Sequence, residues 1–166
     1  VENIEPIKII IIDEILNYFE HIDNVIITGS FLEKGFDFED IDVILITDKK
    51  NDNKKYEEYF KNKLGVNVHI ISMNFKTLLK GISTDPLFQL MVSKFVSKKR
   101  VIFKTKNVIN YKLLDLHLLK SELLIINFHF LTGREKYKFV RNLFAIVLFL
   151  DKKAISSESV DNEINR

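Results

Sequence analysis

Two aspartates at alternate positions open an apolar segment of the chain, and their spacing suits the binding of a hard metal ion. Asp40 and Asp42 flank Ile41, and the side chains of residues 43–46 that follow are entirely hydrocarbon. Because side chains alternate between the two faces of a strand, both carboxylates are expected on one face. Two unpaired carboxylates so close repel each other and are costly to bury, whereas a divalent cation offsets the repulsion. Oxygen ligands of this kind favour Mg²⁺ or Mn²⁺, which also bind substrate phosphates.

Gly29 and Ser30 end the preceding apolar segment, and this pair is suited to binding phosphate. Residues 25–28 are all β-branched, which predicts a buried strand that ends at the glycine. A glycine there lets the backbone approach a ligand closely, and a helical turn that begins at the serine would direct free N–H groups at a phosphate. Each motif alone is most often structural, as a turn or as a solvated strand end. Together, on consecutive predicted strands, they indicate nucleotide chemistry.

The periodicity of the remaining N-terminal residues places these motifs in an α+β fold. Apolar residues at helical spacing predict a helix over residues 6–21, ahead of the first strand. Further strands are predicted over 41–47 and 66–71, with a helix between them that ends at Gly65. The elements predicted next are a short helix over 75–80 stopped by Gly81, a helix capped by Thr84 or Asp85 that runs to about Val96, and a strand over 100–104.

The C-terminal third is predicted to be helical. Residues 111–131 and 134–150 are long and apolar, and Thr132 and Gly133 separate them. Both helices are too apolar to stand alone in water, so we expect them to pack on each other, on the sheet or in a homo-oligomer. The expected organisation is a domain over 1–106, a helical region over 107–151 packed on it, and a polar, frayed tail over 152–166.

The composition excludes several classes of protein. The 166 residues include 25 lysines and arginines against 23 acids, and a net charge of +2 does not indicate a general nucleic-acid-binding surface. The absence of cysteine excludes disulfide scaffolds, thiol catalysis and cysteine-ligated zinc. The longest apolar run, residues 143–150, is far shorter than the roughly 20 residues that cross a bilayer. Since the N-terminus also lacks a signal-peptide pattern, we expect a cytoplasmic protein without a membrane partner.

The segment from Val25 to Thr47 resembles the nucleotidyltransferase superfamily, which includes the minimal nucleotidyltransferases, kanamycin nucleotidyltransferase and DNA polymerase beta. The signature of that family is an apolar strand, Gly-Ser, a loop, and then Asp-apolar-Asp-apolar. Here Gly29-Ser30 is followed by nine residues and then by Asp40-Ile41-Asp42-Val43. The resemblance covers residues 5–105, and its specific motif covers 29–43. It implies a nucleotidyltransferase-like mixed β-sheet packed with helices.

The resemblance also implies an activity. A nucleoside monophosphate would pass from a nucleoside triphosphate, with ATP the first candidate, to an acceptor hydroxyl on a protein, an RNA or a small molecule. Asp40 and Asp42 would hold Mg²⁺ (or Mn²⁺), and Gly29 and Ser30 would hold the triphosphate. The family loop often carries an arginine soon after Gly-Ser. This loop offers Lys34 as the candidate phosphate contact instead, with an ordinary solvated lysine as the alternative.

The sequence departs from the family pattern at the third carboxylate, which usually lies on the strand after the next helix. Residues 66–71 contain no acid, and Asn67 and His69 share the polar face of this predicted strand. His69 could substitute as a ligand or a base, or could be an ordinary hydrogen-bonded histidine. Two alternatives to an enzyme therefore stay open. One is a catalytically weak or inactive module that binds nucleotide or a protein partner, as an antitoxin would, and the other is a structural oligomerisation module.

Overall fold

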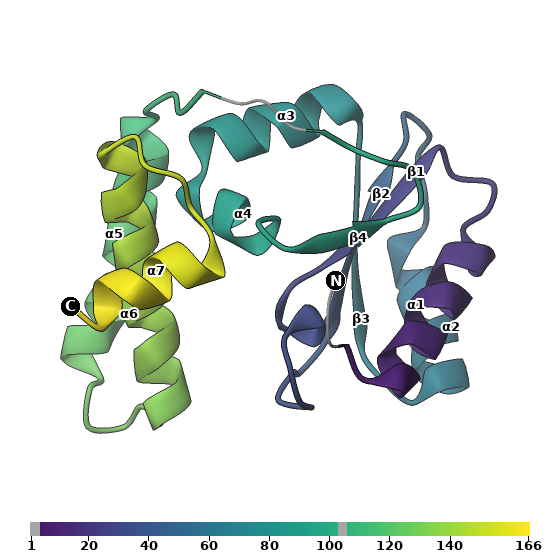
Figure 1. The fold of residues 1–166 in the computed structure, drawn as a ribbon, viewed down its shortest axis with the longest axis horizontal. Coiled ribbons are helices and arrows are strands. Elements are labelled where there is room, and N and C mark those ends of the chain that lie inside the picture. Colours follow the sequence, from purple (N-terminus) through teal and green to yellow (C-terminus); the bar gives the residue numbers. More distant parts are fainter. Residues whose placement is uncertain (1–3, 103–105) are drawn as a thin grey trace. The chain divides into compact units, whose positions relative to one another are not determined.

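The computed structural model describes residues 4–102 and 106–166, and the chain divides into two compact units (Figure 1). The first unit comprises residues 1–79 and 94–103, and the second comprises 80–93 and 104–166. Residues 80–93 thus belong with the C-terminal helices, whereas the sequence places them in the first domain. The chain leaves the first unit and then returns to it for one more strand.

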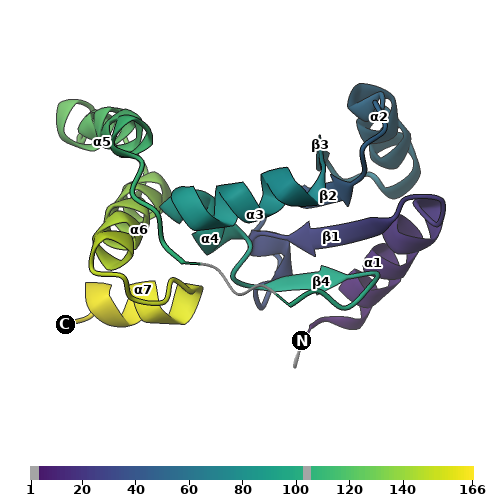
Figure 2. The same ribbon diagram turned by 90° about the horizontal axis from the view of Figure 1, so that it is seen from above.

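The first unit contains a mixed sheet of four strands in the order β3-β2-β1-β4, which Figure 2 shows edge to edge. Strand β1 runs antiparallel to both β2 and β4, whereas β2 and β3 are parallel. This mixed sheet with its helices confirms the predicted α+β class. The strands are β1 (Asn24–Thr28), β2 (Ile41–Ile46), β3 (Val68–Met73) and β4 (Phe95–Ser97).

Two helices, α1 (Pro6–Tyr18) and α2 (Asn53–Leu64), share one apolar core with the sheet. Alternate residues of the strands enter this core because a strand presents every second side chain to the same face. Local signals set the helix ends. Pro6 stands in the first turn of α1, the Asp52 side chain accepts a hydrogen bond from the Lys55 amide at the start of α2, and Gly65 ends α2 in the left-handed conformation, as predicted. Members of this core from both helices, from three of the strands and from the residue that follows α1 are Ile15, Phe19, Val25, Ile27, Val43, Leu45, Phe60 and Ile70.

The second unit is helical. Helix α3 (Phe75–Thr84) begins in the first unit and ends in the second, and four more helices follow. The cluster of Ala145, Leu148, Phe149, Ile155 and Val160 forms the core of this unit. The helices are α4 (Pro86–Met91), α5 (Tyr111–Ile126), α6 (Gly133–Leu150) and α7 (Ser157–Ile164). No helix in the described part of the chain is long and apolar enough to cross a membrane.

Three sequence predictions between residues 75 and 102 are wrong. Gly81 lies inside α3, where a Cβ atom would come within 3.0 Å of the Phe88 ring, so its role is close packing rather than helix termination. Helix α4 ends at Met91, and strand β4 follows where the sequence predicts more helix. Residues 100–102 form no strand, and 103–105 lie outside the described residues.

The predicted tail is also wrong, because α7 is a helix that is capped and packed. Its first turn has a capping box in which Ser156 and Ser159 each bond to the other's backbone. Val160 is fully buried against α6 residues of the same core cluster. Ile155 is buried in the same cluster and Ile164 packs against it, so a segment of mostly polar composition is anchored by three apolar side chains.

Candidate functional site

The Gly-Ser motif and the Asp-x-Asp motif are in direct contact. Thr28, the last residue of β1, pairs with Asp42 of β2, so Gly29 emerges beside the Asp42 side chain. A Cβ atom on Gly29 would overlap the Oδ2 atom of Asp42. Gly29 also has a φ of 87° and a ψ of −169°, a conformation that is essentially restricted to glycine. Both the backbone conformation and the space available therefore require glycine at this position.

His69 of β3 completes a contact across the parallel pair of strands. The register pairs Asp42 with His69, and the Nδ1 atom of His69 lies 3.2 Å from the Oδ1 atom of Asp42. The Asp42 side chain is 21% exposed, whereas the His69 side chain is 54% exposed. One carboxylate oxygen of Asp42 thus faces the histidine, while the other faces the glycine. The imidazole remains open to a molecule that approaches from solvent.

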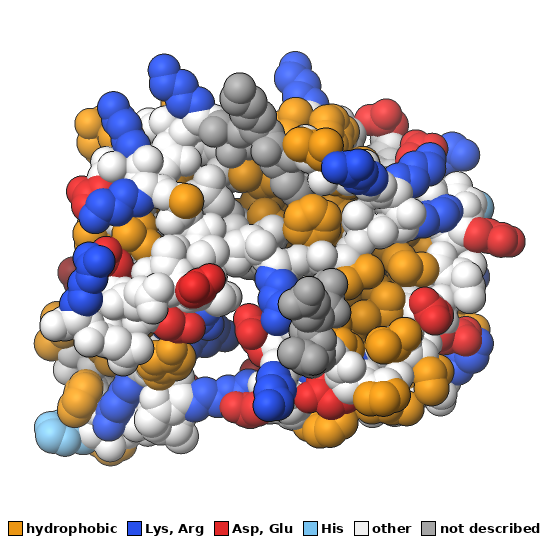
Figure 3. All heavy atoms as spheres, in the orientation of Figure 1, with side chains coloured by type: hydrophobic (Ala, Val, Ile, Leu, Met, Phe, Trp, Pro, Cys, Tyr) orange, Lys and Arg blue, Asp and Glu red, His pale blue; other side chains and the backbone are white. Residues whose placement is uncertain are grey.

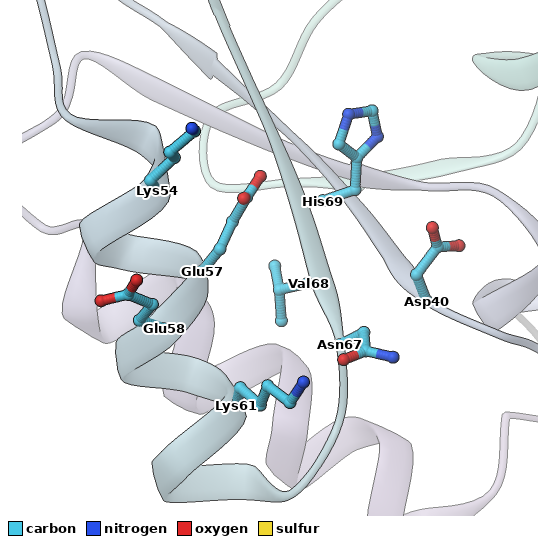
Figure 4. A pocket seen from close by; sticks show the side chains of 8 residues that line it. All are labelled: Asp40, Lys54, Glu57, Glu58, Lys61, Asn67, Val68 and His69. Atoms are coloured by element: carbon cyan, nitrogen blue, oxygen red, sulfur yellow. The ribbon is translucent and has the colours of Figure 1, made fainter.

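Asp40 and Asn67 lie just before β2 and β3, respectively, rather than within them. The Asn67 carbonyl accepts a hydrogen bond of 2.9 Å from the Ile41 amide, which joins the two strand starts. Asp40, Asn67 and His69 line one side of a cleft of about 430 Å³ (Figure 4). In this view their side chains lie on one side of β3, and the other labelled polar side chains come from α2 on the far side: Lys54, Glu57, Glu58 and Lys61.

Helix α2 is fixed to the outer edge of β3 by side chains that bond to its backbone. The Ile70 amide donates to Glu57 at 2.9 Å, and the Ile70 carbonyl accepts from Asn53 at 2.9 Å. Ser72 donates a further hydrogen bond of 2.7 Å to Asn53. These bonds occupy backbone groups of an edge strand that would otherwise be open to another strand. Glu57 therefore has a structural role in the wall of the cleft. No local pattern in the sequence indicates this role.

The loop after Gly29 begins with a short 3₁₀ helix, η1 (Ser30–Leu32), so a helical turn does start at the serine. Ser30 itself is exposed, whereas Phe31 and Leu32 are buried. Lys34 follows on the exposed part of the loop. A second lysine, Lys94, is anchored at the same end of β1 because its carbonyl accepts a 2.8 Å hydrogen bond from Thr28. Sequence patterns give no indication of Lys94, since the contact depends on the pairing of β4 with β1.

The loop between the two motifs is held by a buried lysine of α1. Lys8 is fully buried, and its ammonium group donates hydrogen bonds to the Glu33 carbonyl at 2.7 Å and the Gly35 carbonyl at 2.5 Å. It also pairs with the Glu5 carboxylate at 3.1 Å. Three aromatic rings surround the ammonium group with their centroids 5.4–5.5 Å away, those of Phe31, Phe36 and Phe38.

Glu5 holds the same loop from the other side. Its carboxylate accepts a hydrogen bond of 2.5 Å from the Gly35 amide. The Gly35 hydrogen bond, followed by the hydrogen bond to Glu5's own amide and the neighbouring Lys8, lowers the pKa of Glu5 to about 2. Charged Glu5 and charged Lys8 therefore act together to fix the path of the chain between Gly29 and Asp40. In the sequence, one lysine among the isoleucines of α1 gives no indication that Lys8 and Glu5 hold this loop.

Within residues 4–102 and 106–166, no three histidine or acidic side chains are placed to hold a metal ion together. The candidate donors are the Asp42 carboxylate, which contacts the His69 imidazole, and Asp40 and Asn67, which line the cleft together with His69. Mg²⁺ commonly binds through one or two carboxylates and completes its shell with substrate phosphates and water. The donor set fits an ion that arrives with a phosphate ligand.

Lysine, arginine and acidic side chains are interspersed on the face of each unit seen in Figure 3, in keeping with a net charge close to zero. Comparison with known proteins gives no match: no family model, no curated protein and no solved structure is significantly similar to the chain. Function must therefore be inferred from the residues around Asp42.

Proposed function

We propose that this protein is a nucleotidyltransferase-like enzyme, which transfers a nucleoside monophosphate from a nucleoside triphosphate to an acceptor hydroxyl. The observation that carries the proposal is the contact between Gly29 and the Asp42 carboxylate. A phosphate that binds at the Gly29-Ser30 turn would lie next to a carboxylate that can share its metal ion. Either motif alone would be an ordinary turn or strand end, but their contact supports a common ligand.

Asp40, Asp42 and the Asn67 amide oxygen are the groups that would hold Mg²⁺ or Mn²⁺ together with the triphosphate. The ion would neutralise charge on the phosphates during transfer. The activity proposed here uses one metal ion, bound by these groups and by the triphosphate. An imidazole is a better ligand for Mn²⁺ than for Mg²⁺, so His69 favours Mn²⁺.

Where His69 does not bind the ion, its imidazole is the candidate general base. Asp42 can hold the proton on Nδ1 of His69, which leaves Nε2 to accept a proton from the acceptor hydroxyl. The acceptor oxygen then bonds to the α-phosphorus. The bond from that phosphorus to the bridging oxygen breaks, and pyrophosphate leaves with the electron pair. The exposed position of His69 supports this role, because an acceptor must reach it from solvent.

The second candidate function is nucleotide binding without turnover, which would suit a regulatory or antitoxin-like protein. The observation that favours it is the same contact of His69 with Asp42. His69 lies on the strand on which the family usually has its third acid. Its imidazole contacts the Asp42 carboxylate, which a metal ion would also need as a ligand. The replacement of the third acid by a histidine should weaken nucleotide binding through Gly29 and Ser30 less than it weakens catalysis.

The test is incubation with each labelled nucleoside triphosphate and Mg²⁺, followed by measurement of triphosphate binding, pyrophosphate release and labelled acceptor. Asp42→Asn should abolish metal-dependent binding and release. Asp48→Asn is the matched control, because Asp48 follows the far end of β2, about 20 Å from Asp42 at the rise of a strand. Binding without release would support the second candidate. If no triphosphate binds to the unmodified protein, both candidates are wrong.

A further inference from the structure

Helix α5 carries an exposed apolar stripe. Leu116, Leu119, Leu123 and Ile126 are 45–70% exposed, and they follow one another at intervals of three, four and three residues. This spacing places all four on one face, at the a and d positions of a heptad. The opposite face of α5 is the one covered within the second unit, through Leu114, His117 and Ser121.

The stripe is the part of the exposed apolar surface of α5 that lies on one face. Nine large apolar side chains between residues 111 and 130 are at least 45% exposed, and four of them make up the stripe. Leu118 and Ile125 lie on other sides of the helix, so the nine do not form one contact surface. The four stripe side chains form a narrow apolar seam of the kind that pairs in a coiled coil.

The charged side chains next to the stripe favour a second copy of this chain as the partner and a parallel arrangement of the two α5 helices. Asp115 and Glu122 occupy the g positions of the heptad, and Lys120 occupies an e position; all three are exposed. In a parallel pair of identical helices, Asp115 faces the partner's Lys120, and the symmetry of the pair makes this contact twice. In an antiparallel pair, Lys120 faces the partner's Lys120 and Glu122 faces the partner's Glu122. The stripe is thus complementary to itself in the parallel direction alone.

We propose that α5 is a dimer interface, in which the stripe of Leu116, Leu119, Leu123 and Ile126 packs in parallel against the same stripe of a second copy of this chain. A two-fold axis then runs alongside the two helices. This inference does not depend on the nucleotide chemistry proposed for Asp42.

The first test measures the mass of the full chain by light scattering and by sedimentation over a range of concentrations. The unmodified protein should have twice the mass of the 19.5 kDa chain. Leu123→Lys should convert it to a monomer. Leu118→Lys is the matched control, since Leu118 has the same 45% exposure on the same helix but lies about 120° around the helix from the stripe. Circular dichroism should show equal helix content in both variants.

The second test uses the absence of cysteine from the chain. Leu116→Cys and Ile126→Cys are made as separate proteins and oxidised mildly. The two positions lie about 15 Å apart along the helix, and a disulfide requires Cα atoms within roughly 7 Å. A parallel dimer cross-links each variant to itself. Cross-linking only in a mixture of the two variants would mean an antiparallel pair and would overturn the proposal.

A charge exchange tests the direction independently. Asp115→Lys alone and Lys120→Asp alone should each weaken the dimer, and the double variant should restore it. A monomeric mass for the unmodified protein at every concentration would overturn the proposal outright. In that case, the stripe is covered by another part of the chain or by a different protein.

Discussion

Gly29 and Asp42 lie in contact across the antiparallel pair of β1 and β2, so that the glycine leaves the space that one carboxylate oxygen fills. The contact joins two motifs that are separated by a loop in the sequence. It also makes the glycine a structural requirement of the site, whether or not phosphate binds there. Substitutions at Gly29 must therefore be judged on folding and on binding separately.

Gly29→Val should lower both the stability of the protein and its affinity for triphosphate. The side chain would overlap Asp42, and the backbone conformation alone costs about 1–3 kcal/mol for a residue other than glycine. Ser30→Ala removes an exposed hydroxyl, so it should leave stability unchanged and weaken triphosphate binding by about 1 kcal/mol. Thermal unfolding and calorimetry with Mg²⁺ and ATP measure the two effects. Normal triphosphate binding by a folded Gly29→Val protein would refute the phosphate site.

His69→Asp should supply a third carboxylate, which can bind the ion and also take the acceptor proton in place of His69, and so raise activity with Mg²⁺. The register pairs His69 with Asp42, so the new carboxylate lies beside the existing one. The unmodified protein should be more active with Mn²⁺ than with Mg²⁺, and the variant should shift this preference toward Mg²⁺. Asn67→Asp is the comparison, because Asn67 precedes β3 and lines the cleft together with Asp40. Pyrophosphate release with each metal measures the change. Fast release by the unmodified protein with Mg²⁺, together with no gain in either variant, would show that another acid completes the site.

Lys8→Met should destabilise the protein by about 1–3 kcal/mol, because the Glu33 and Gly35 carbonyls would lose their buried donor. Urea unfolding measures the loss. Lys34→Met, an exposed change in the same loop, should stay within about 0.5 kcal/mol of the unmodified protein. Equal stability of the two variants would mean that Lys8 is not what holds the loop.

Glu5 should make the stability of the protein depend on acid pH. Its pKa is lowered from 4.5 to about 2 in the folded protein, mainly by the Gly35 hydrogen bond. The folded state therefore binds this proton less readily than the unfolded state. The contribution is complete above about pH 4.5 and is lost as the pH falls toward 2. Glu5→Gln should be less stable than the unmodified protein at pH 6, and the difference should narrow below pH 4.5. A constant difference across this range would contradict the lowered pKa.

Features that depend on neighbouring residues could be predicted from the sequence. The β-branched run before Gly29 forms β1, Gly65 ends α2, and Asp85 caps α4 through the Leu87 and Phe88 amides. In each case, the pattern and the hydrogen bonds that satisfy it lie within a few residues. The contact of His69 with Asp42 follows once the two strands are known to be parallel.

Features that depend on distant pairing could not be predicted. Strand β4 has only three residues, and it pairs with the edge of β1 that lies opposite to β2. Lys8 stands among isoleucines at helical spacing, and its partners belong to a loop more than twenty residues later. The α7 helix packs through Val160 and Ile164 in a mostly polar segment. Tertiary contacts decide all three, and no local pattern reports them.

The return of the chain to the first unit for β4 has a consequence for synthesis on the ribosome. Residues 80–93, which belong to the second unit, are made before the strand that completes the sheet. Until residues 94–103 emerge, the outer edge of β1 has open backbone groups, and such an edge can pair with another chain. A nascent chain stalled before that point would thus be prone to aggregate. For the same reason, a fragment that ends at residue 79 cannot reproduce the first unit.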